Sequence, residues 1–183
     1  MTHRSAGELA AGLDAIRRSP ATDGTVEMIV RRPGEDAREV LEAGELTPDE
    51  GLVGDDWKGR GSRSTPDGSA NPDCQLTLMN ARAVDLLASG DRTAWPLAGD
   101  QLYVDLDLSI ENLPPGTRLA VGDAIVEVTE PPHTGCAKFS ARFGSEAMRF
   151  VNSPEGRALR LRGMNARVVE AGTVRRGDAA RRI

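Results

Sequence analysis

The spacing of apolar residues separates a short helical start from a longer, strand-rich remainder. Near the N-terminus, apolar residues recur at helical spacing: Leu9, Leu13 and Ile16. Ser5 and Glu8 form the S-x-x-E pattern that caps a helix N-terminus. We therefore expect a helix near residues 5–18, within an N-terminal helical extension that spans residues 1–24.

From residue 25 onward, short apolar runs alternate with turns that contain Gly and Pro. The expected strands are 26–32, 38–46, 76–79, 102–105, 118–121, 124–129, 160–162 and 166–171. Further helices are expected near 81–89 and 136–151, the latter broken at Gly144, and a closing turn near 174–178. Many short strands with closely spaced turns favour a barrel or a sandwich over a doubly wound parallel sheet. We predict a mostly β domain over residues 25–183, a closed or nearly closed β-barrel with peripheral helices.

Residues 51–75 are polar and rich in Gly, which predicts either a functional loop or a mobile surface segment. The first part reads GLVGDDWKGRG and combines glycines with Asp55, Lys58 and Arg60. Such a loop can present backbone N–H groups and cations to an anionic ligand. It is not a P-loop, because the order G-x-x-x-x-G-K-[ST] is absent.

Composition narrows the class of protein. The 183 residues have a net charge of -5 and an aromatic content of 3%. Without net positive charge or an aromatic platform, nucleic acid is not the expected partner. The sequence has no apolar run near the roughly 20 residues that cross a bilayer, and its N-terminus lacks the apolar core of a secretion signal. We expect no membrane association and a cytoplasmic location.

Cys136 is the first candidate for chemistry. It follows Pro131-Pro132 and opens a predicted helix, whose free N–H groups favour a thiolate. Lys138 and Arg142 add positive charge nearby. A thiolate is the reactive form for sulfur transfer or for binding a soft metal. The alternative is a buried structural cysteine.

The other Cys and His residues give weaker signals. His133 and Cys136 form H-x-x-C, but a zinc site needs three or four ligands. His3 lies in the predicted tail and Cys74 in the long loop, so a complete zinc set is not expected. On the residues alone, we interpret His133 as a surface or turn histidine. We interpret Cys74 as structural, or as a partner of Cys136 if the loop folds over it.

Several segments, taken in order, resemble the MOSC domain, the C-terminal domain of molybdenum-cofactor sulfurases that also occurs as stand-alone bacterial proteins. The segments are GLVGDDWKGRG, QLTLMN, GDQLYVDLDLS, LPPGTRLAVGDAIVEVTEPPHTGCAKF and NARVVEAGTVRRGD. The likeness covers roughly residues 25–180 and is most specific from Gly99 to Phe139. It implies a distorted barrel with surrounding helices that binds the pterin-based molybdenum cofactor and delivers or receives sulfur.

The resemblance also implies roles for individual residues. Cys136 matches the cysteine that carries sulfur or contacts the molybdenum, and Lys138 matches a frequent basic residue after it. Gly54 and Asp55 match the G-D of the early loop, and Asp100 lies where related proteins have G-E-N. The residues expected to bind the cofactor are His133, Lys138, Arg142, Gly54, Asp55, Lys58, Arg60 and Asp100. The expected partners are a pterin-type cofactor or a sulfur donor protein, with a redox partner in reductase-like members.

Some features depart from the family pattern. Gly135 stands where many members have Pro, and the pyridoxal-phosphate domain of full sulfurases is missing. With only Lys58 and Lys138 present, no pyridoxal-phosphate lysine is assigned. Three functions stay open. The chain is a sulfur carrier with Cys136 as the carrier, a non-catalytic pterin- or anion-binding module in which Cys136 is structural, or the cofactor-holding component of a reductase of N-hydroxylated compounds.

Overall fold

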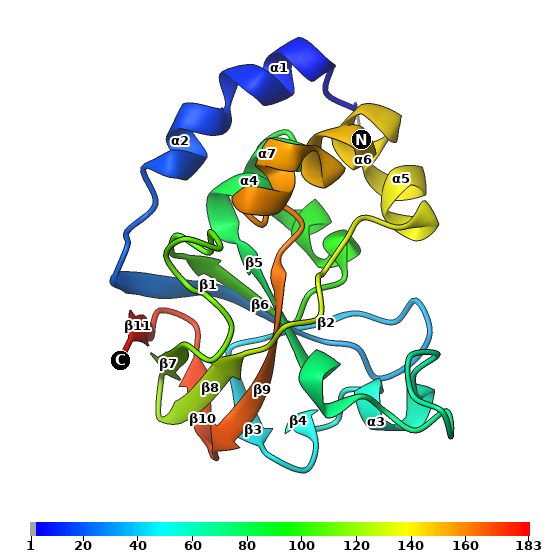
Figure 1. Ribbon diagram of the computed structural model, residues 1–183, viewed down its shortest axis with the longest axis vertical. Helices are drawn as coiled ribbons and strands as arrows, with labels where there is room; N and C mark the ends of the chain where they lie inside the picture. Colours follow the sequence, from blue (N-terminus) through cyan, green and yellow to red (C-terminus); the bar gives the residue numbers. More distant parts are fainter. Residues whose placement is uncertain (1–2) are drawn as a thin grey trace.

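A closed barrel forms because an early strand pairs with the last strand of the chain. In the computed structural model, which describes residues 3–183, β1 (Asp23–Arg31) pairs antiparallel with β11 (Ala179–Arg182). The other strands of the seven-strand ring are β7 (Arg118–Val121), β8 (Ala124–Val128), β9 (Met164–Glu170), β5 (Leu76–Asn80) and β6 (Leu102–Asp105). Neighbouring strands are antiparallel except β5 and β6. Figure 1 shows this ring below a layer of helices, and the predicted barrel with peripheral helices is confirmed.

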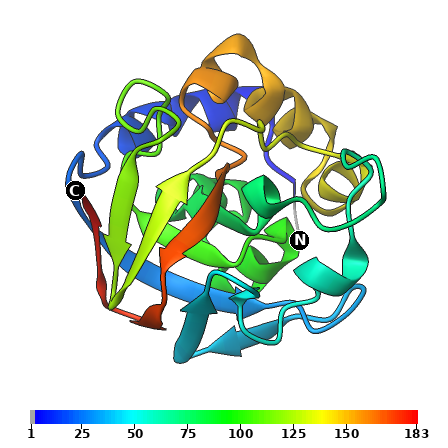
Figure 2. The same cartoon turned by 60° about the horizontal axis from the view of Figure 1, so that its bottom comes forward.

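The remaining strands extend the barrel. β2 (Glu39–Leu41) pairs antiparallel with the C-terminal end of β1. β10 (Gly172–Arg175), β3 (Ala43–Thr47) and β4 (Gly51–Leu52) form a separate three-stranded sheet. This small sheet lies at the end of the barrel away from the helical layer, the end that Figure 2 brings forward.

The strands β5 and β6 are buried on both faces, which explains their nearly continuous apolar runs, whereas β7 and β8 alternate between buried and partly exposed positions. In β6, Leu102 and Val104 belong to the cluster inside the barrel, whereas Tyr103 belongs to the cluster beneath the helices. In β5, Leu78 and Met79 divide between the two clusters in the same way. Because side chains alternate across a strand, each of these strands contributes to two cores.

All the α-helices except α3 (Trp57–Arg60) gather at one end of the barrel, at the top of Figure 1. They are α1 (Ala6–Ala11), α2 (Leu13–Arg17), α4 (Ala81–Leu87), α5 (Ala137–Phe143), α6 (Ser145–Asn152) and α7 (Pro154–Ala158). Their buried side chains include Leu9, Phe139 and Phe143, which share one cluster with the outward side chains of β1, β5 and β6. None of the helices within residues 3–183 is long and apolar enough to cross a membrane.

The predicted first helix is present as two short helices. Ser5 Oγ accepts a hydrogen bond from the Glu8 backbone N–H, and the Glu8 side chain accepts one from Ser5, so the capping box is formed. The helix breaks at Gly12, where a Cβ atom would lie 2.5 Å from the methyl carbons of Leu86. The missing side chain of Gly12 thus leaves room for Leu86 of α4.

The structure corrects several element predictions. Residues 160–162 form a turn and not a strand, and Arg160 there has a φ of 48°. The predicted strand 38–46 is divided into β2 and β3. The polar segment 51–75 contains β4, α3 (Trp57–Arg60) and the 3-10 helix η1 (Pro72–Cys74). The predicted closing turn begins within β10 and is followed by β11, which closes the barrel.

Candidate functional site

Cys136 lies at the N-cap of α5, at the end of an extended segment that follows β8. Asn165 Nδ2 donates to the Pro131 carbonyl at 2.9 Å, and the Gly135 N–H donates to Asn152 Oδ1 at 3.0 Å, so both parts of the segment are fixed. A Cβ atom on Gly135 would lie 2.7 Å from Met148 Sδ, so the missing side chain lets the segment approach α6. The Cys136 side chain ends up exposed, as a free thiol.

The sequence of α5 determines which of its side chains face the solvent. Phe139 and Phe143, four residues apart, are buried with ring centroids 5.0 Å apart. This anchors one face of the helix in the core. Lys138 and Arg142 therefore lie toward the outside, near Cys136 in the sequence and on the same short helix.

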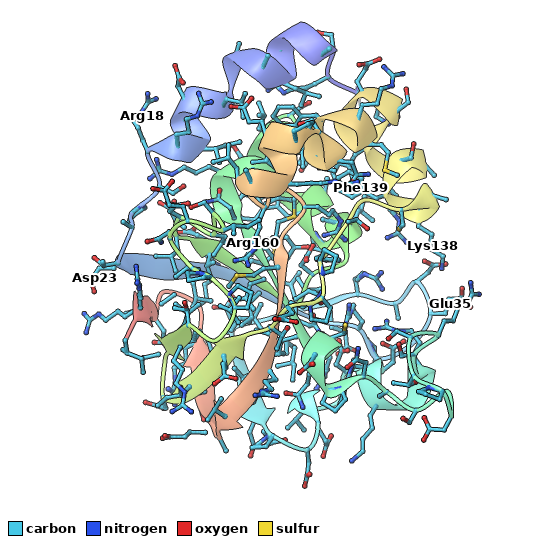
Figure 3. The ribbon with its side chains drawn as sticks, viewed as in Figure 1. Arg18, Asp23, Glu35, Lys138, Phe139 and Arg160 are labelled. Carbon is cyan, nitrogen blue, oxygen red and sulfur yellow. The ribbon has the colours of Figure 1, made fainter. Side chains whose placement is uncertain are left out.

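Both cations of α5 contact the loop of residues 33–37, here called the acidic loop. Lys138 Nζ lies 2.9 Å from Glu35 Oε1 and 3.5 Å from Asp36 Oδ1, and Arg142 Nη2 donates to Asp36 Oδ1 at 2.7 Å. Figure 3 shows Lys138 and Glu35 pointing toward each other from α5 and the loop. The hydrogen bond to Glu35 raises the pKa of Lys138. The α5 cations are thus paired with carboxylates, in contacts that stay exposed to solvent.

A cleft of about 820 Å³ lies between the acidic loop and the α3 region. Lys138 and Arg60 line it from two different elements, together with Asp55 and Asp56. Arg60 is paired with Asp56 at 3.0 Å. Lys58 is exposed on α3 and is not among the lining residues. The structure therefore brings Arg60 and Lys138 together, whereas Lys58, Arg142 and Cys136 are not among the residues that line this cleft.

Asp55 has a structural partner. Its two carboxylate oxygens accept from Arg32 Nε at 2.9 Å and from Arg32 Nη2 at 2.8 Å, in a buried bidentate pair. Arg32 Nη1 donates to the Gly99 carbonyl at 2.8 Å. Although burial opposes the charge of Arg32, the hydrogen bonds and charge of Asp55 raise its pKa. Gly54, in the left-handed region with a φ of 80°, turns the chain just before this pair.

Asp100 is the centre of a second buried group. Its Oδ2 accepts from Arg162 Nη1 at 2.6 Å, and its Oδ1 lies 3.3 Å from His133 Nδ1. Arg162 also donates to the Ala98 carbonyl at 2.8 Å and lies over the ring of Phe139. Two buried polar atoms, Asp100 Oδ1 and Arg162 Nε, have no hydrogen bond of good geometry within residues 3–183.

The electrostatics of this group favour a neutral His133 beside an ionised Asp100. Burial, followed by the charge of Arg162, lowers the pKa of His133 and outweighs the attraction of Asp100. Burial alone would raise the pKa of Asp100, but the charge and the hydrogen bond of Arg162 lower it. The segment that leads to Cys136 therefore packs, through His133, against the buried ion pair of Asp100 and Arg162.

Sequence reasoning missed Arg32 and Arg162, which hold the two acidic residues that it did identify. Arginine is too frequent in this chain for either residue to stand out, and their partners lie 23 and 62 positions away. It also expected no complete zinc site. Within residues 3–183, no three His, Cys, Asp or Glu side chains are grouped as metal ligands.

The family follows from comparison with known sequences. A sequence model of the MOSC domain matches residues 65–181, more than half of the chain. The chain belongs to the MOSC domain family. MOSC domains are associated with binding of the molybdenum cofactor. A search of curated protein sequences finds no match.

Solved MOSC-type structures share the fold. YuaD from Bacillus subtilis is 14% identical, with a TM-score of 0.65 over 86% of this chain and 94% of its own. YiiM from Escherichia coli is 17% identical, with a TM-score of 0.56 over 87% of this chain and 69% of its own. YiiM from Geobacillus stearothermophilus is 12% identical, with a TM-score of 0.58 over 87% and 75%. At these identities, the likeness establishes the fold alone.

Proposed function

We propose that this MOSC domain binds a pterin-type molybdenum cofactor in the cleft beside α5, and that Cys136 carries sulfur for it or contacts its metal. The observation that carries the proposal is the exposed, free thiol of Cys136 at the start of α5. A cysteine kept only for structure is normally buried among apolar side chains. Here, Phe139 and Phe143 fill the core position and leave the thiol accessible.

The residues around the cleft fit such a cofactor. A thiolate is a suitable ligand for a soft metal and a suitable acceptor of sulfane sulfur. Arg60 and Lys138 line the cleft and supply cations for a phosphate group, and Arg142 adds a third cation at the acidic loop, where it is paired with Asp36. When bound, the cofactor would supply the metal-centred redox chemistry, and this chain would supply its binding and orientation.

The acidic loop sets a condition on binding. Lys138 is paired with Glu35 and Arg142 with Asp36. An anionic ligand must therefore displace these carboxylates before it can bind the two cations. Exposed ion pairs contribute little, typically about 0–1 kcal/mol each. Displacing the loop therefore costs little compared with the gain from placing a phosphate on the same cations.

As a carrier, Cys136 would take sulfane sulfur from a persulfide donor protein. The Cys136 thiolate attacks the outer sulfur of the donor persulfide, a new S–S bond forms on Cys136, and the donor leaves as its thiolate. The step needs no further oxidant, because the sulfur moves in the oxidation state that it already has. Access to a donor explains why the thiol lies at the surface.

The test is to isolate the protein from cells that make the cofactor and to measure its molybdenum, its pterin and its intact mass. The matched variants are Cys136→Ala and Cys74→Ala, which remove the exposed and the half-buried thiol respectively. We expect wild type and Cys74→Ala to contain molybdenum and pterin, or to gain the mass of one sulfur atom from a persulfide donor. Cys136→Ala should lose the sulfur adduct and bind molybdenum less tightly.

Two outcomes would reject parts of the proposal. If wild type contains neither molybdenum nor pterin under these conditions, cofactor binding is wrong. If Cys136→Ala binds both as well as wild type and still gains sulfur, the role of Cys136 is wrong. The chain is then a binding module without a functional thiol.

A further inference from the structure

A second, smaller cavity of about 300 Å³ lies where residues 129–134 meet the turn between α7 and β9. It shares no lining residue with the cleft beside α5. Three arginines line it: Arg157, Arg160 and Arg162. Its size lies at the lower end of the range of ligand pockets. The proposed cofactor site gives this cavity no role.

Arg160 is the unusual residue of this cavity. Its φ of 48° places a residue with a long side chain in the left-handed region, which costs about 1–3 kcal/mol and tends to occur at functional sites. Figure 3 shows Arg160 in the middle of the molecule, below α7. The backbone turn directs a half-buried guanidinium into the cavity wall.

The charge of Arg160 has no acidic partner. Nη1 donates to the carbonyls of Leu113 at 2.6 Å and Leu108 at 3.3 Å. Within residues 3–183, no carboxylate lies within ion-pair distance of its guanidinium. Burial without such a partner lowers the pKa of Arg160. A half-buried guanidinium whose partners are carbonyls alone keeps its charge uncompensated, so an anion in the cavity can pair with it.

The rest of the cavity wall points to the kind of anion. Arg157 adds a second guanidinium without a carboxylate partner in the described chain, and Arg162 contributes a buried Nε without a hydrogen bond. Glu130 is the one acidic residue in the lining, which disfavours a multiply charged ligand. Ile110 and Met164 give an apolar surface, and Ile110 is 48% exposed.

We propose that this cavity binds a small organic carboxylate, with the carboxylate held by Arg160 and Arg157 and the apolar part of the ligand against Ile110 and Met164. A guanidinium binds a carboxylate through two parallel N–H bonds, which Arg160 can offer from Nη2 and Nε while Nη1 keeps its carbonyl partners. His133, expected from the sequence to bind the cofactor, lines this cavity, but neither Cys136 nor any residue that lines the cleft beside α5 does.

Benzoate is a suitable probe, and its binding to the full chain is measured by titration calorimetry. We expect saturable binding, with affinity about ten-fold or more lower in Arg160→Gln because a charge-assisted pair is lost. Arg18→Gln is the matched control, since Arg18 is exposed on another part of the molecule, as Figure 3 shows. It should bind benzoate as wild type does.

Arg160→Gln also removes the hydrogen bonds to two carbonyls, so a second variant guards against a folding defect. Ile110→Asp places a negative charge at the exposed rim of the cavity, leaves Arg160 in place and should weaken benzoate binding. Benzamide, the neutral analogue of the probe, should bind much more weakly than benzoate.

The proposal is overturned if wild type shows no saturable benzoate binding, or if folded Arg160→Gln and Ile110→Asp both bind like wild type. Tighter binding of inorganic phosphate than of benzoate would also reject the carboxylate. Cys136→Ala should bind benzoate unchanged, whereas its molybdenum content should fall. Failure of this inference is therefore distinguishable from failure of the proposed function.

Discussion

Arg162 Nη1 lies 2.6 Å from Asp100 Oδ2, and both side chains are almost completely removed from solvent. The pair joins the loop before β6 to the turn before β9, and His133, in the segment that leads to Cys136, lies 3.3 Å from Asp100. The buried ion pair thus adds a third fixed point to this segment, beside the hydrogen bonds of Pro131 with Asn165 and of Gly135 with Asn152. A cofactor site between separate loops requires such fixed points.

Replacing one member of this pair should destabilise the protein strongly. Arg162→Met leaves the Asp100 carboxylate buried without its cation, and we expect a loss of about 3–5 kcal/mol in the free energy of unfolding. Urea denaturation measures it. The double variant Asp100→Asn with Arg162→Met removes both charges and should recover a large part of this loss. Equal stability of the single and the double variant would contradict this interpretation.

The barrel could be predicted from the sequence because its signal is local. Leu102–Asp105 and Arg118–Val121 form strands with the predicted bounds, since Gly and Pro turns delimit each apolar run. Residues 160–162 were mistaken for a strand because the pattern RLR alternates polar and apolar residues. Tertiary contacts determine the conformation of these residues. Arg160 has a left-handed backbone conformation, and its Nη1 donates to the Leu113 carbonyl.

The candidate site was less predictable, because it depends on pairs that are distant in the sequence. Lys138 and Arg142 were expected to be available to an anion, yet Glu35 and Asp36 reach them from a loop about a hundred residues earlier. Asp55 was expected at the cofactor, yet Arg32 occupies both of its oxygens. Neither the composition nor the residue spacing of a sequence shows that two segments so far apart in the chain lie side by side in the fold.

The neutral state of His133 predicts a pH dependence of stability. Its pKa in the folded protein lies below the usual value of 6.5, since burial, Arg162 and the more distant Arg32 oppose the imidazolium more than Asp100 favours it. As the pH falls through 6.5, the unfolded chain therefore binds a proton that the folded chain does not. The free energy of unfolding should decrease from about pH 6.5 down to the folded-state pKa.

Urea unfolding at about pH 7.5 and at about pH 5.5 measures this effect. The variant His133→Gln cannot titrate and should lose less stability between these two conditions than wild type does. The lowered pKa of Asp100 acts in a separate window, below its usual value of 3.8. If His133→Gln loses as much stability as wild type over this range, His133 is not the group responsible.

The acidic loop should reduce the affinity of the cleft for anions. In the double variant Glu35→Gln with Asp36→Asn, Lys138 and Arg142 lose their carboxylate partners. Asn tolerates the left-handed φ of 54° at position 36. We expect binding of inorganic pyrophosphate, followed by calorimetry, to strengthen roughly two- to ten-fold at low salt.

A control variant tests whether this effect is local. Glu42→Gln removes one carboxylate from another exposed pair, with Arg176, and should leave pyrophosphate affinity nearly unchanged. The advantage of the double variant should shrink at high salt, since exposed pairs are screened. Unchanged or weaker binding in the double variant would show that the loop carboxylates do not compete with the ligand.

The two thiols should react at different rates with an alkylating reagent. Cys136 is exposed, whereas burial and the neighbouring charge of Asp73 raise the pKa of the half-buried Cys74 above its usual value. Because the thiolate is the nucleophile, Cys74 is both less accessible and less ionised at neutral pH. Iodoacetamide followed by intact-mass measurement should show one fast modification in wild type and in Cys74→Ala, and only slow modification in Cys136→Ala. The slow reaction should accelerate as the pH rises, because more Cys74 then ionises. Fast modification that persists in Cys136→Ala would assign the accessible thiol to Cys74 and remove the observation on which the proposed function rests.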